Sequence, residues 1–574
     1  MIRRPPRSTL SSSSAASDVY KRQPYYYGTY EGGSAPTGID HVPGLDNFTK
    51  QRIVVVGSGP IRIGQGIEFD YGCVHAVGAI RESGHEAIII NNNPETVSTD
   101  FDTSDRLYFD PLTLEHTAEI LLREKAHGIL LQFGGQTAIN LALPLAGRLP
   151  HLESMGLNLA MQGTSPDAVD EASDRQRFEE FAERVGLRMP NGTTASTPEG
   201  VRNAVKEIGY PVLIRPSYVL GGRGMEILSN DRQLAAYMEE AFLSPDRPLL
   251  VDEYLGNATE LDVDAVCDGS EVLIGAIMEH LEEAGIHSGD STCFIPPQNV
   301  SKKILAQVED WTRKIGLELG VIGCFNIQYA IRGETLYVLE VNPRGSRTFP
   351  FVAKATGVPL ARIAARLTLG EKLADLDFPE PQTEAVCVKA PVFPFIKLRG
   401  LDPAPGPEMK STGEVMGSHK RAAAAYLKAR LATELPVPTE GGVYITVKNA
   451  DKHDVIPLAQ ELEEMGFTIY ATRGTAHVLR DSGGVNVQTC YRITEGLTPD
   501  ALDLMRQGKI HLIINTPRST GGAVLDGNMM RRLAVELNIP FVTTMAGARM
   551  EVQAIAEARE GMPEPRLLDI AVLK

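Results

Sequence analysis

Short runs of consecutive apolar residues alternate with longer segments of helical apolar spacing along most of the chain. From residue 51 the run "RIVVV" leads into a glycine-rich turn and a helix predicted near 68–83, followed by the runs "EAIII" and "GILL". Such runs are typical of strands buried on both faces, and their alternation with helices predicts a parallel sheet covered by helices. We therefore predict a Rossmann-like domain over residues 51–170.

A second block, residues 171–400, mixes helices with strands such as "PVLIRP", "FNIQYAI" and "TLYVLEVNP", and we predict a second α/β domain there. Proline- and glycine-rich stretches on both sides of a helical segment at 419–433 indicate a connecting segment over 401–437. The last block, 438–574, returns to alternating strands and helices, with a helix predicted at 452–465. This pattern predicts a small doubly wound domain with a parallel sheet.

The amino-terminal residues differ in composition from everything that follows. Residues 1–23 are basic and serine-rich and contain no apolar run of the kind found in secretory signals. Their arginine and serine content also fits a transit peptide, but we predict a non-native leader, from a fusion or a misassembled reading frame. Residues 24–50 are rich in glycine, proline and tyrosine and are predicted to be a linker.

Composition and charge exclude several classes of function. The net charge of −17 over 574 residues argues against nucleic acid or an anionic membrane as a partner. No run of about 18 apolar residues is present, so we expect a soluble protein. The six cysteines contain no C-x-x-C pair, which predicts reduced thiols and a cytoplasmic location.

The stretch "YVLEVNPRGSR" places polar side chains on a strand that otherwise belongs in a core. Glu340 and Asn342 leave the same face, because side chains at i and i+2 of a strand do so. A hairpin would bring Gln328, on the preceding strand, beside them. Three oxygen ligands suit Mg²⁺ with bound ATP phosphates, and Arg344 and Arg347 would stabilise a transferring phosphoryl group. The alternative is a structural ion pair between Glu340 and an arginine.

Two glycine-rich segments have both a functional and a structural interpretation. "RPSYVLGGRGMEI", residues 215–227, resembles a hairpin that folds over a triphosphate, although a simple surface hairpin has the same pattern. "GSGPIRIGQG", residues 57–66, suggests a dinucleotide turn, but its spacing is not G-x-G-x-x-G and the next strand ends in three asparagines. We favour a turn that closes over another part of the site. His287, in a loop beside acidic residues, is by itself more often structural than functional.

Taken together, "RIGQGIEFDY", "NNNPETVSTD", "FGGQT", "RPSYVLGGRGMEI", "HSGDS", "EVNPRGSRT" and "STGEVMG" resemble the large subunit of carbamoyl-phosphate synthetase. The resemblance covers residues 24–574 and is to its carboxy-terminal half, with one "EVNPR" and one "RPSYVLGG" instead of an internal repeat. It implies a Rossmann-like pre-ATP-grasp domain, an ATP-grasp domain and a methylglyoxal-synthase-like allosteric domain. The implied activity is the ATP-dependent phosphorylation of carbamate to carbamoyl phosphate, feeding pyrimidine and arginine synthesis.

The resemblance also implies site residues, carried over at matching motif positions. The cofactor would be ATP with Mg²⁺ or Mn²⁺, with K⁺ as a further candidate. Arg344 and Arg347 would be catalytic, and Gln328, Glu340 and Asn342 would hold the metal. Glu253 and Leu255 would alternate along a strand around the adenine. The implied ATP contacts are Arg175, Arg215, Glu253, Leu255, Glu260, Gly285, Ile286, His287, Ser288, Gln328 and Glu340.

In the last domain the resemblance implies an effector site for a nucleotide such as UMP. The implied phosphate-binding positions are Thr472, Gly474, Thr475, Arg492, Asn515 and Thr516. Arg492 stands where the bacterial pattern has a lysine, and Pro517 where it continues with threonine. The implied partners are a glutamine-amidotransferase small subunit and the amino-terminal half that phosphorylates bicarbonate, in an oligomeric complete enzyme.

Other functions stay open at this point. One is a different ATP-grasp ligase that activates bicarbonate, as a biotin carboxylase does. Another is a non-catalytic regulatory or assembly module, which failure to bind Mg·ATP would favour. An NAD oxidoreductase is the most remote, because of the spacing in residues 57–66.

We predict that ornithine activates this protein weakly or not at all. Glu282, Asp290 and Thr543 match the ornithine site of some bacterial members. Three positions depart from it: Ala390 replaces a glutamate, Phe541 a tyrosine and Pro405 a leucine. An amino-acid cation would therefore lose a carboxylate partner. The check is the reaction rate with and without ornithine, and a rise at low millimolar concentration would contradict the prediction.

Overall fold

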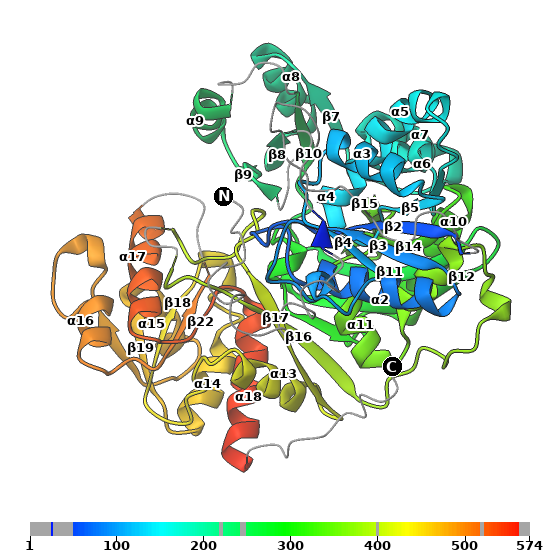
Figure 1. Ribbon diagram of the computed structural model, residues 1–574. Coiled ribbons are helices and arrows are strands. Elements are labelled where there is room, and N and C mark those ends of the chain that lie inside the picture. The colour runs from blue at the N-terminus through cyan, green and yellow to red at the C-terminus, as the bar shows by residue number, and fades with distance from the viewer. Residues whose placement is uncertain are drawn as a thin grey trace, which may run out of the picture.

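The computed structural model of the chain describes residues 25–26, 50–216, 222–241, 248–397, 401–516 and 522–561. In this part of the chain the strands form four sheets, which Figure 1 shows with their covering helices. The leader predicted for residues 1–23 and most of the linker predicted for 24–50 lie outside the described residues. Tyr25–Tyr26, within that linker, forms the edge strand β1 of the first sheet.

The first sheet is parallel, in the order β1-β4-β3-β2-β5-β6, as the alternating pattern predicts. All five residues of β2 are buried, in agreement with the consecutive apolar run. The strands after β1 are β2 (Arg52–Val56), β3 (Glu86–Ile90), β4 (Arg106–Tyr108), β5 (Gly128–Leu130) and β6 (Ala160–Gln162). Its helices are α2 (Glu68–Glu82), α3 (Leu114–Glu124), α4 (Gly135–Ile139), α5 (Ala142–Ser154) and α6 (Pro166–Ser173).

A four-stranded antiparallel sheet, β7-β10-β8-β9, forms a small unit with two helices at the top of Figure 1. The predicted glycine-rich hairpin is the pair β8 and β9, and its residues 217–221 lie outside the described part. The bounds are β7 (Gly192–Ala195), α8 (Pro198–Ile208), β8 (Val212–Pro216), β9 (Glu226–Leu228), α9 (Asp231–Ala241) and β10 (Leu249–Glu253).

The central sheet has seven antiparallel strands in the order β15-β14-β11-β12-β13-β16-β17. Its strands are β11 (Thr259–Asp268), β12 (Val272–Glu283), β13 (Cys293–Ile295), β14 (Ile322–Arg332), β15 (Thr335–Asn342), β16 (Val386–Val392) and β17 (Gly413–His419). The helices against it are α7 (Arg175–Val185), α10 (Lys302–Glu318), α11 (Phe349–Thr356) and α12 (Leu360–Thr368). Helix α12 packs on β11 and β14 and also contacts α2, so one apolar core joins the first sheet to this one.

Strand pairing crosses the boundary predicted at residue 400. Strand β17 lies within the predicted connecting segment and pairs along its whole length with β16. The helical segment predicted at 419–433 is α13 (Ala422–Ala432), which begins three residues later because β17 continues to His419. The segment 401–437 therefore adds a strand to the central sheet and a helix that packs against it.

The fourth sheet is parallel, in the order β20-β19-β18-β21-β22, and is the doubly wound arrangement predicted for the last block. The helix predicted at 452–465 begins at Ile456, after a 3-10 turn and four turn residues. The strands are β18 (Gly442–Thr446), β19 (Thr468–Thr472), β20 (Val487–Cys490), β21 (Leu512–Asn515) and β22 (Phe541–Val542). The helices are α14 (Ile456–Glu464), α15 (Arg473–Asp481), α16 (Ala501–Arg506), α17 (Gly522–Glu536) and α18 (Met545–Glu560).

Two expectations from composition can be compared with the structure. All six cysteines are buried free thiols, as the absence of a C-x-x-C pair predicts. In the described ranges, no helix has the length and apolar character needed to cross a membrane.

One carboxylate lies in the interior of the central sheet. The side chain of Asp264, on β11, accepts hydrogen bonds from the Thr348 hydroxyl at 2.6 Å and from the Asn326 amide at 2.9 Å. Burial, with a smaller effect of Asp262, raises the pKa of Asp264 from 3.8 to about 6. Between pH 3.8 and about 6, the folded chain thus keeps a proton on Asp264 that the unfolded chain releases. The free energy of unfolding therefore falls as the pH rises through this range.

We predict that Asp264→Asn removes this pH dependence. Between pH 3.8 and about 6, the free energy of unfolding of the parent should fall relative to that of the variant, which cannot titrate. Denaturant unfolding at several pH values measures the difference. The control is Asp268→Asn on the same strand. Burial opposes ionisation of Asp268, but hydrogen bonds from Ser270 and nearby backbone outweigh it and lower its pKa to about 2. This control should shift stability by a constant amount, and parallel curves for parent and Asp264→Asn would contradict the prediction.

Candidate functional site

A cavity of about 550 Å³ lies where the first three sheets meet. All the residues predicted from the sequence to bind ATP, hold the metal or act in catalysis line this one cavity. They are Arg175, Arg215, Glu253, Leu255, Glu260, Gly285, Ile286, His287, Ser288, Gln328, Glu340, Asn342, Arg344 and Arg347. The structure therefore brings together side chains that are up to 172 positions apart in the chain.

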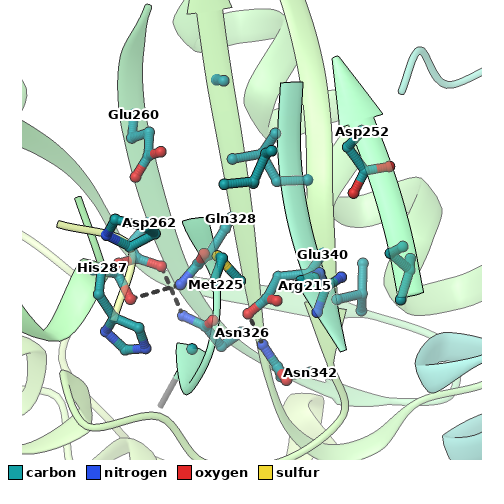
Figure 2. A pocket seen from close by; sticks show the side chains of 18 of the residues that line it. Arg215, Met225, Asp252, Glu260, Asp262, His287, Asn326, Gln328, Glu340 and Asn342 are labelled. Carbon is teal, nitrogen blue, oxygen red and sulfur yellow. Dashed lines mark hydrogen bonds between the residues drawn. The ribbon is translucent and has the colours of Figure 1, made fainter. Parts of the chain in front are cut away.

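The hairpin β14–β15 has the geometry that the spacing predicts. Gln328 stands opposite Glu340 in the strand register, and Asn326 stands opposite Asn342. Glu340 and Asn342 share a face, since the Asn342 amide donates a hydrogen bond of 2.9 Å to the Glu340 carboxylate. Figure 2 shows Gln328, Glu340 and Asn342 close together in the cavity, with His287 on one side and Asp252 on the other.

The donor set of this hairpin fits a hard divalent cation. Gln328 donates its amide N–H to the Ser288 hydroxyl at 2.7 Å, so its amide oxygen is the atom left to act as a ligand. Together with the Glu340 carboxylate and the Asn342 amide oxygen, it offers the oxygen chemistry that Mg²⁺ takes alongside phosphate and water. Within the described residues, no group of three His, Cys, Asp or Glu side chains is arranged to hold a metal ion. A cation here would therefore be held by one carboxylate, that of Glu340, by the two amide oxygens, and by oxygens of a bound nucleotide or water.

Arg344 follows this hairpin directly and is held by both neighbouring sheets. Its guanidinium donates to the Asn342 side-chain oxygen at 3.0 Å, and to the side-chain oxygen of Gln136 on α4, also at 3.0 Å. Burial lowers the pKa of Arg344, while Glu340 acts in the opposite direction. A guanidinium fixed at the cavity wall is suited to an anionic group that develops charge.

Arg347 is engaged in a buried ion pair with the first sheet. It binds the carboxylate of Glu68, at the start of α2, through two nitrogens at 3.0 and 3.3 Å. Burial alone would lower the pKa of Arg347, but Glu68 outweighs it and the pKa is raised. Glu68 belongs to the motif "RIGQGIEFDY", and Gly64 of the same motif lines the cavity. The turn at 57–66 thus contributes Gly64 to the cavity wall, and its closing over the site stays a prediction.

The loop of residues 285–291 forms another wall of the cavity. The Gly285 N–H donates to the Glu260 carboxylate at 3.1 Å, with Gly285 at a φ of +95° that favours glycine. The His287 ring accepts the Gly289 N–H at 3.0 Å, and burial lowers the pKa of this imidazole. His287 is thus a partly buried side chain in the cavity wall and not an exposed loop residue.

Three charged residues form the opposite wall. Arg175, the first residue of α7, contacts the Asp252 carboxylate at 3.0 Å. Burial raises the pKa of Asp252, and the charges of Arg175 and Arg215 oppose this rise. Asp252 went unnoticed in the sequence, although it directly precedes Glu253. It forms an ion pair with Arg175, and both residues line the cavity.

The expected alternation of Glu253 and Leu255 along one strand is wrong. Strand β10 ends at Glu253, and a hydrogen bond from Gly256 N–H to Tyr254 carbonyl turns the chain directly afterwards. Glu253 accepts hydrogen bonds from Arg332 at 2.7 Å and Asn191 at 3.1 Å, and Leu255 is 4% exposed. Both still line the cavity, one polar and one apolar, but from a strand end and a turn.

Sequence reasoning missed a buried charged group beneath the site. Lys389, on β16, is 1% exposed and donates to the Ser288 carbonyl at 3.3 Å. His280 contacts the carboxylate of Asp262 at 3.0 Å, and Cys293, Asp262 and Glu260 together raise the pKa of His280 against the effect of burial. The only available signal was indirect: a lysine and a histidine within otherwise apolar strand patterns.

A second, smaller cavity of about 50 Å³ lies at the carboxyl ends of β18, β19 and β21. This is beside the point where the strand order of the parallel sheet reverses, a usual place for ligands in such folds. Five of the six predicted effector residues line it, namely Thr472, Gly474, Thr475, Arg492 and Asn515. The sixth, Thr516, instead uses its hydroxyl to accept the Lys448 N–H at 2.9 Å.

Two further points concern this second cavity. Lys452, which the sequence analysis missed, also lines it and adds a cation beside Arg492. Thr472 precedes α15, so Gly474 and Thr475 lie in the first turn of a helix, where backbone N–H groups favour anions. Pro517, at which the sequence departs from the bacterial pattern, lies outside the described residues.

Comparison with known families covers most of the chain. A model described as carbamoyl phosphate synthase preATP-grasp domain matches residues 49–171. The model for the carbamoyl-phosphate synthase L chain, ATP binding domain, matches residues 174–376, and one for an MGS-like domain matches 454–543. The first match spans β2 to β6, the second spans the four-stranded sheet and β11 to β15 of the central sheet, and the third spans β19 to β22 of the last sheet.

Curated relatives lead to the same family. The carbamoyl phosphate synthase large chain of Methanothermobacter thermautotrophicus is 48% identical over 559 residues, which are 96% of this chain and 51% of the relative. The large chain, C-terminal section, of Methanocaldococcus jannaschii is 48% identical over 562 residues, 95% of this chain and 88% of the relative. The chain thus spans about half the length of the first relative and most of the second.

Among solved structures, the ADP complex of N5-carboxyaminoimidazole ribonucleotide synthetase superposes with a TM-score of 0.50 at 14% identity. The similarity covers 67% of this chain and 96% of that one, and concerns the fold alone. The identity and coverage of the Methanocaldococcus relative carry the assignment. The chain belongs to the carbamoyl phosphate synthase large-chain family.

Proposed function

We propose that this chain uses ATP to phosphorylate carbamate, giving carbamoyl phosphate and ADP. The observation that supports the proposal is the hairpin carrying Gln328, Glu340 and Asn342, with Arg344 beside it, in the cavity lined by all the predicted nucleotide contacts. ATP with Mg²⁺ is the proposed cofactor, in keeping with the ATP binding domain matched over residues 174–376. In this reaction a carbamate oxygen forms a bond to the γ-phosphorus, and the bond from that phosphorus to the bridging oxygen of ADP breaks.

The chain's own groups would act by positioning and charge compensation. The loop 285–291 and the wall of Arg175, Arg215 and Glu253 would enclose the nucleotide. Arg344, fixed by Gln136 and Asn342, would hold the carbamate carboxylate and stabilise the charge of the transferring group. Arg347 would act mainly by holding the loop between β15 and α11 in place, because two of its three guanidinium nitrogens bind Glu68 and the third donates to the Ser411 hydroxyl at 3.3 Å.

A divalent cation, when bound, would supply charge neutralisation between the phosphates. Glu340 would provide its anionic ligand, and Gln328 and Asn342 the neutral ones. Mn²⁺ in its place and K⁺ as a second cation are further proposals.

We also propose a regulatory and a cellular role. The second cavity would bind the phosphate of a nucleotide such as UMP, with Arg492 and Lys452 as cations and the α15 turn as donor. The partners would be a glutamine-amidotransferase small subunit and a polypeptide equivalent to the other half of the longer relatives. The product would serve pyrimidine and arginine synthesis in the cytoplasm, and the complete enzyme would be an oligomer.

The reverse reaction tests the chemistry without an unstable substrate. Purified chain mixed with carbamoyl phosphate and MgADP should form ATP, measured with luciferase. Glu340→Gln should lower the rate more than about 100-fold, since even groups one step removed from a metal cost about 10–100-fold. The matched control is Glu334→Gln, because Glu334 lies in the turn of the same hairpin with its side chain 91% exposed and should not affect the rate.

Two results would count against the proposal. If a folded chain that binds MgADP forms no ATP, it does not carry the phosphoryl transfer by itself, and a regulatory module becomes the better description. If Glu340→Gln and Glu334→Gln behave alike, the hairpin is not the metal site.

A further inference from the structure

A buried ion pair connects the wall of the second cavity to the segment 402–411. Arg531, on α17, is 2% exposed and binds both carboxylate oxygens of Asp402, at 2.9 and 2.6 Å. Its remaining terminal nitrogen donates to the side-chain oxygen of Asn515, which lines the second cavity. One guanidinium thus joins a residue of the proposed effector site to a residue that lies outside it.

On helix α17, Gly527 leaves the space that the Arg531 guanidinium occupies beside Asn515. A β-carbon placed on Gly527 would lie 2.8 Å from the Arg531 guanidinium nitrogen and 3.5 Å from the Asn515 oxygen. A side chain at this position would therefore require the guanidinium to shift from its place beside Asn515. The bidentate pairing uses the planar geometry that arginine offers and lysine does not.

The segment 402–411 in turn holds the loop 285–291 of the first cavity. The His287 N–H donates to the Gly406 carbonyl at 2.8 Å. The carboxylate of Asp290 accepts the N–H groups of Lys410 at 2.8 Å and Ser411 at 2.9 Å. The Ser411 hydroxyl donates to the Gly289 carbonyl at 2.9 Å. Four hydrogen bonds therefore join the two segments next to Ser288, the partner of Gln328.

Asp402 also organises its own segment. Its carboxylate accepts the Ala404 N–H at 3.0 Å, and the Lys410 ammonium contacts the Asp402 carbonyl at 3.2 Å and the Ala404 carbonyl. Arg531 thus anchors the end of a short loop that is closed on itself by Lys410. Its far end carries the contacts to the loop 285–291.

We propose that Arg531 is a positioning residue that, through Asp402, holds the segment 402–411 against the loop 285–291 and so couples the second cavity to the first. An anion entering the second cavity beside Asn515 competes with Asp402 for the guanidinium, which weakens the anchor and loosens the loop. The coupling step rests on the proposed binding of nucleotides in both cavities, whereas the holding step does not. We therefore expect an anionic effector in the second cavity to inhibit the reaction in the first.

The test uses the full chain with the variants Asp402→Asn and Arg531→Met. Asp402 is partly exposed and Asn has the same shape, so this variant keeps the fold even if loss of the buried arginine does not. The control is Arg559→Met, because Arg559 in the same domain donates to the carbonyl of Thr439 at 2.8 Å, away from this segment. Arg531→Lys keeps the charge without the bidentate contact and should behave between parent and Arg531→Met.

Hydrogen exchange measures the holding step without any ligand. The amides of His287, Lys410 and Ser411 should exchange about tenfold faster in Asp402→Asn and Arg531→Met, and at the parental rate in Arg559→Met. Unchanged exchange at these three amides in Asp402→Asn would overturn the proposal.

Binding titrations measure the coupling step, with MgADP and UMP as the probes. Asp402→Asn should bind MgADP at least about fivefold more weakly, and the weakening of MgADP binding that UMP causes in the parent should be lost. If the parent binds UMP and the variant keeps the full UMP effect, the coupling is wrong. If the parent binds no UMP while the amides respond as expected, the effector proposal fails and the positioning role of Arg531 stands.

Discussion

The site depends on one short segment, residues 343–348, that is fixed from two sheets at once. Gln132 lies shortly after β5 of the first sheet. Its side-chain amide donates to the Pro343 carbonyl at 3.0 Å, and its backbone carbonyl accepts the Gly345 N–H at 2.9 Å. On the other side, Thr348 donates to the carboxylate of Asp264 in the central sheet. Arg344 lies between these anchors and has little freedom to leave the cavity wall.

The arrangement places several charges in the interior, and each has a partner that offsets part of its desolvation cost. Arg347 pairs with Glu68 through two nitrogens, which is the geometry in which a buried pair recovers most of that cost. Within the described part of the chain, no cation contacts Asp264; its carboxylate is bonded instead to a hydroxyl and an amide, so burial raises its pKa. Such buried polar groups add little to stability, but they permit few alternative packings of the segment.

Much of this could be predicted from the sequence, since the decisive signals are local. The apolar runs identified β2 and β3, and the i, i+2 spacing of Glu340 and Asn342 predicted their shared face. Strand β17 was not predicted, because "GEVMGSH" has neither a run of apolar residues nor a regular alternation of apolar and polar residues. Leu255 was misplaced because "LLVDEYL" gives no sign that the strand ends at Glu253.

Contacts between distant segments were beyond such reasoning. Lys389 is a single lysine in a strand, and Arg531 is one of two adjacent arginines in a helix; in both cases the pattern alone suggests a solvated side chain. Their burial follows from which elements pack on them, which only the tertiary structure reveals. The resemblance to a known family supplied the set of cavity residues, but not the side chains that orient them.

The four sheets are joined in different ways, and this determines which part can respond to a ligand. The first and central sheets share one apolar core, through α2 and α12. The buried cluster of the four-stranded unit, in contrast, is drawn from residues 195–251 of that unit itself. Polar contacts such as Arg175 with Asp252, Arg332 with Glu253 and Tyr254 with the Ala284 carbonyl connect the end of its strand β10, and the turn directly after it, to the rest. Separating the first and central sheets would expose their shared apolar core to water, which costs free energy in proportion to the area exposed, whereas the buried apolar cluster of the four-stranded unit lies within that unit.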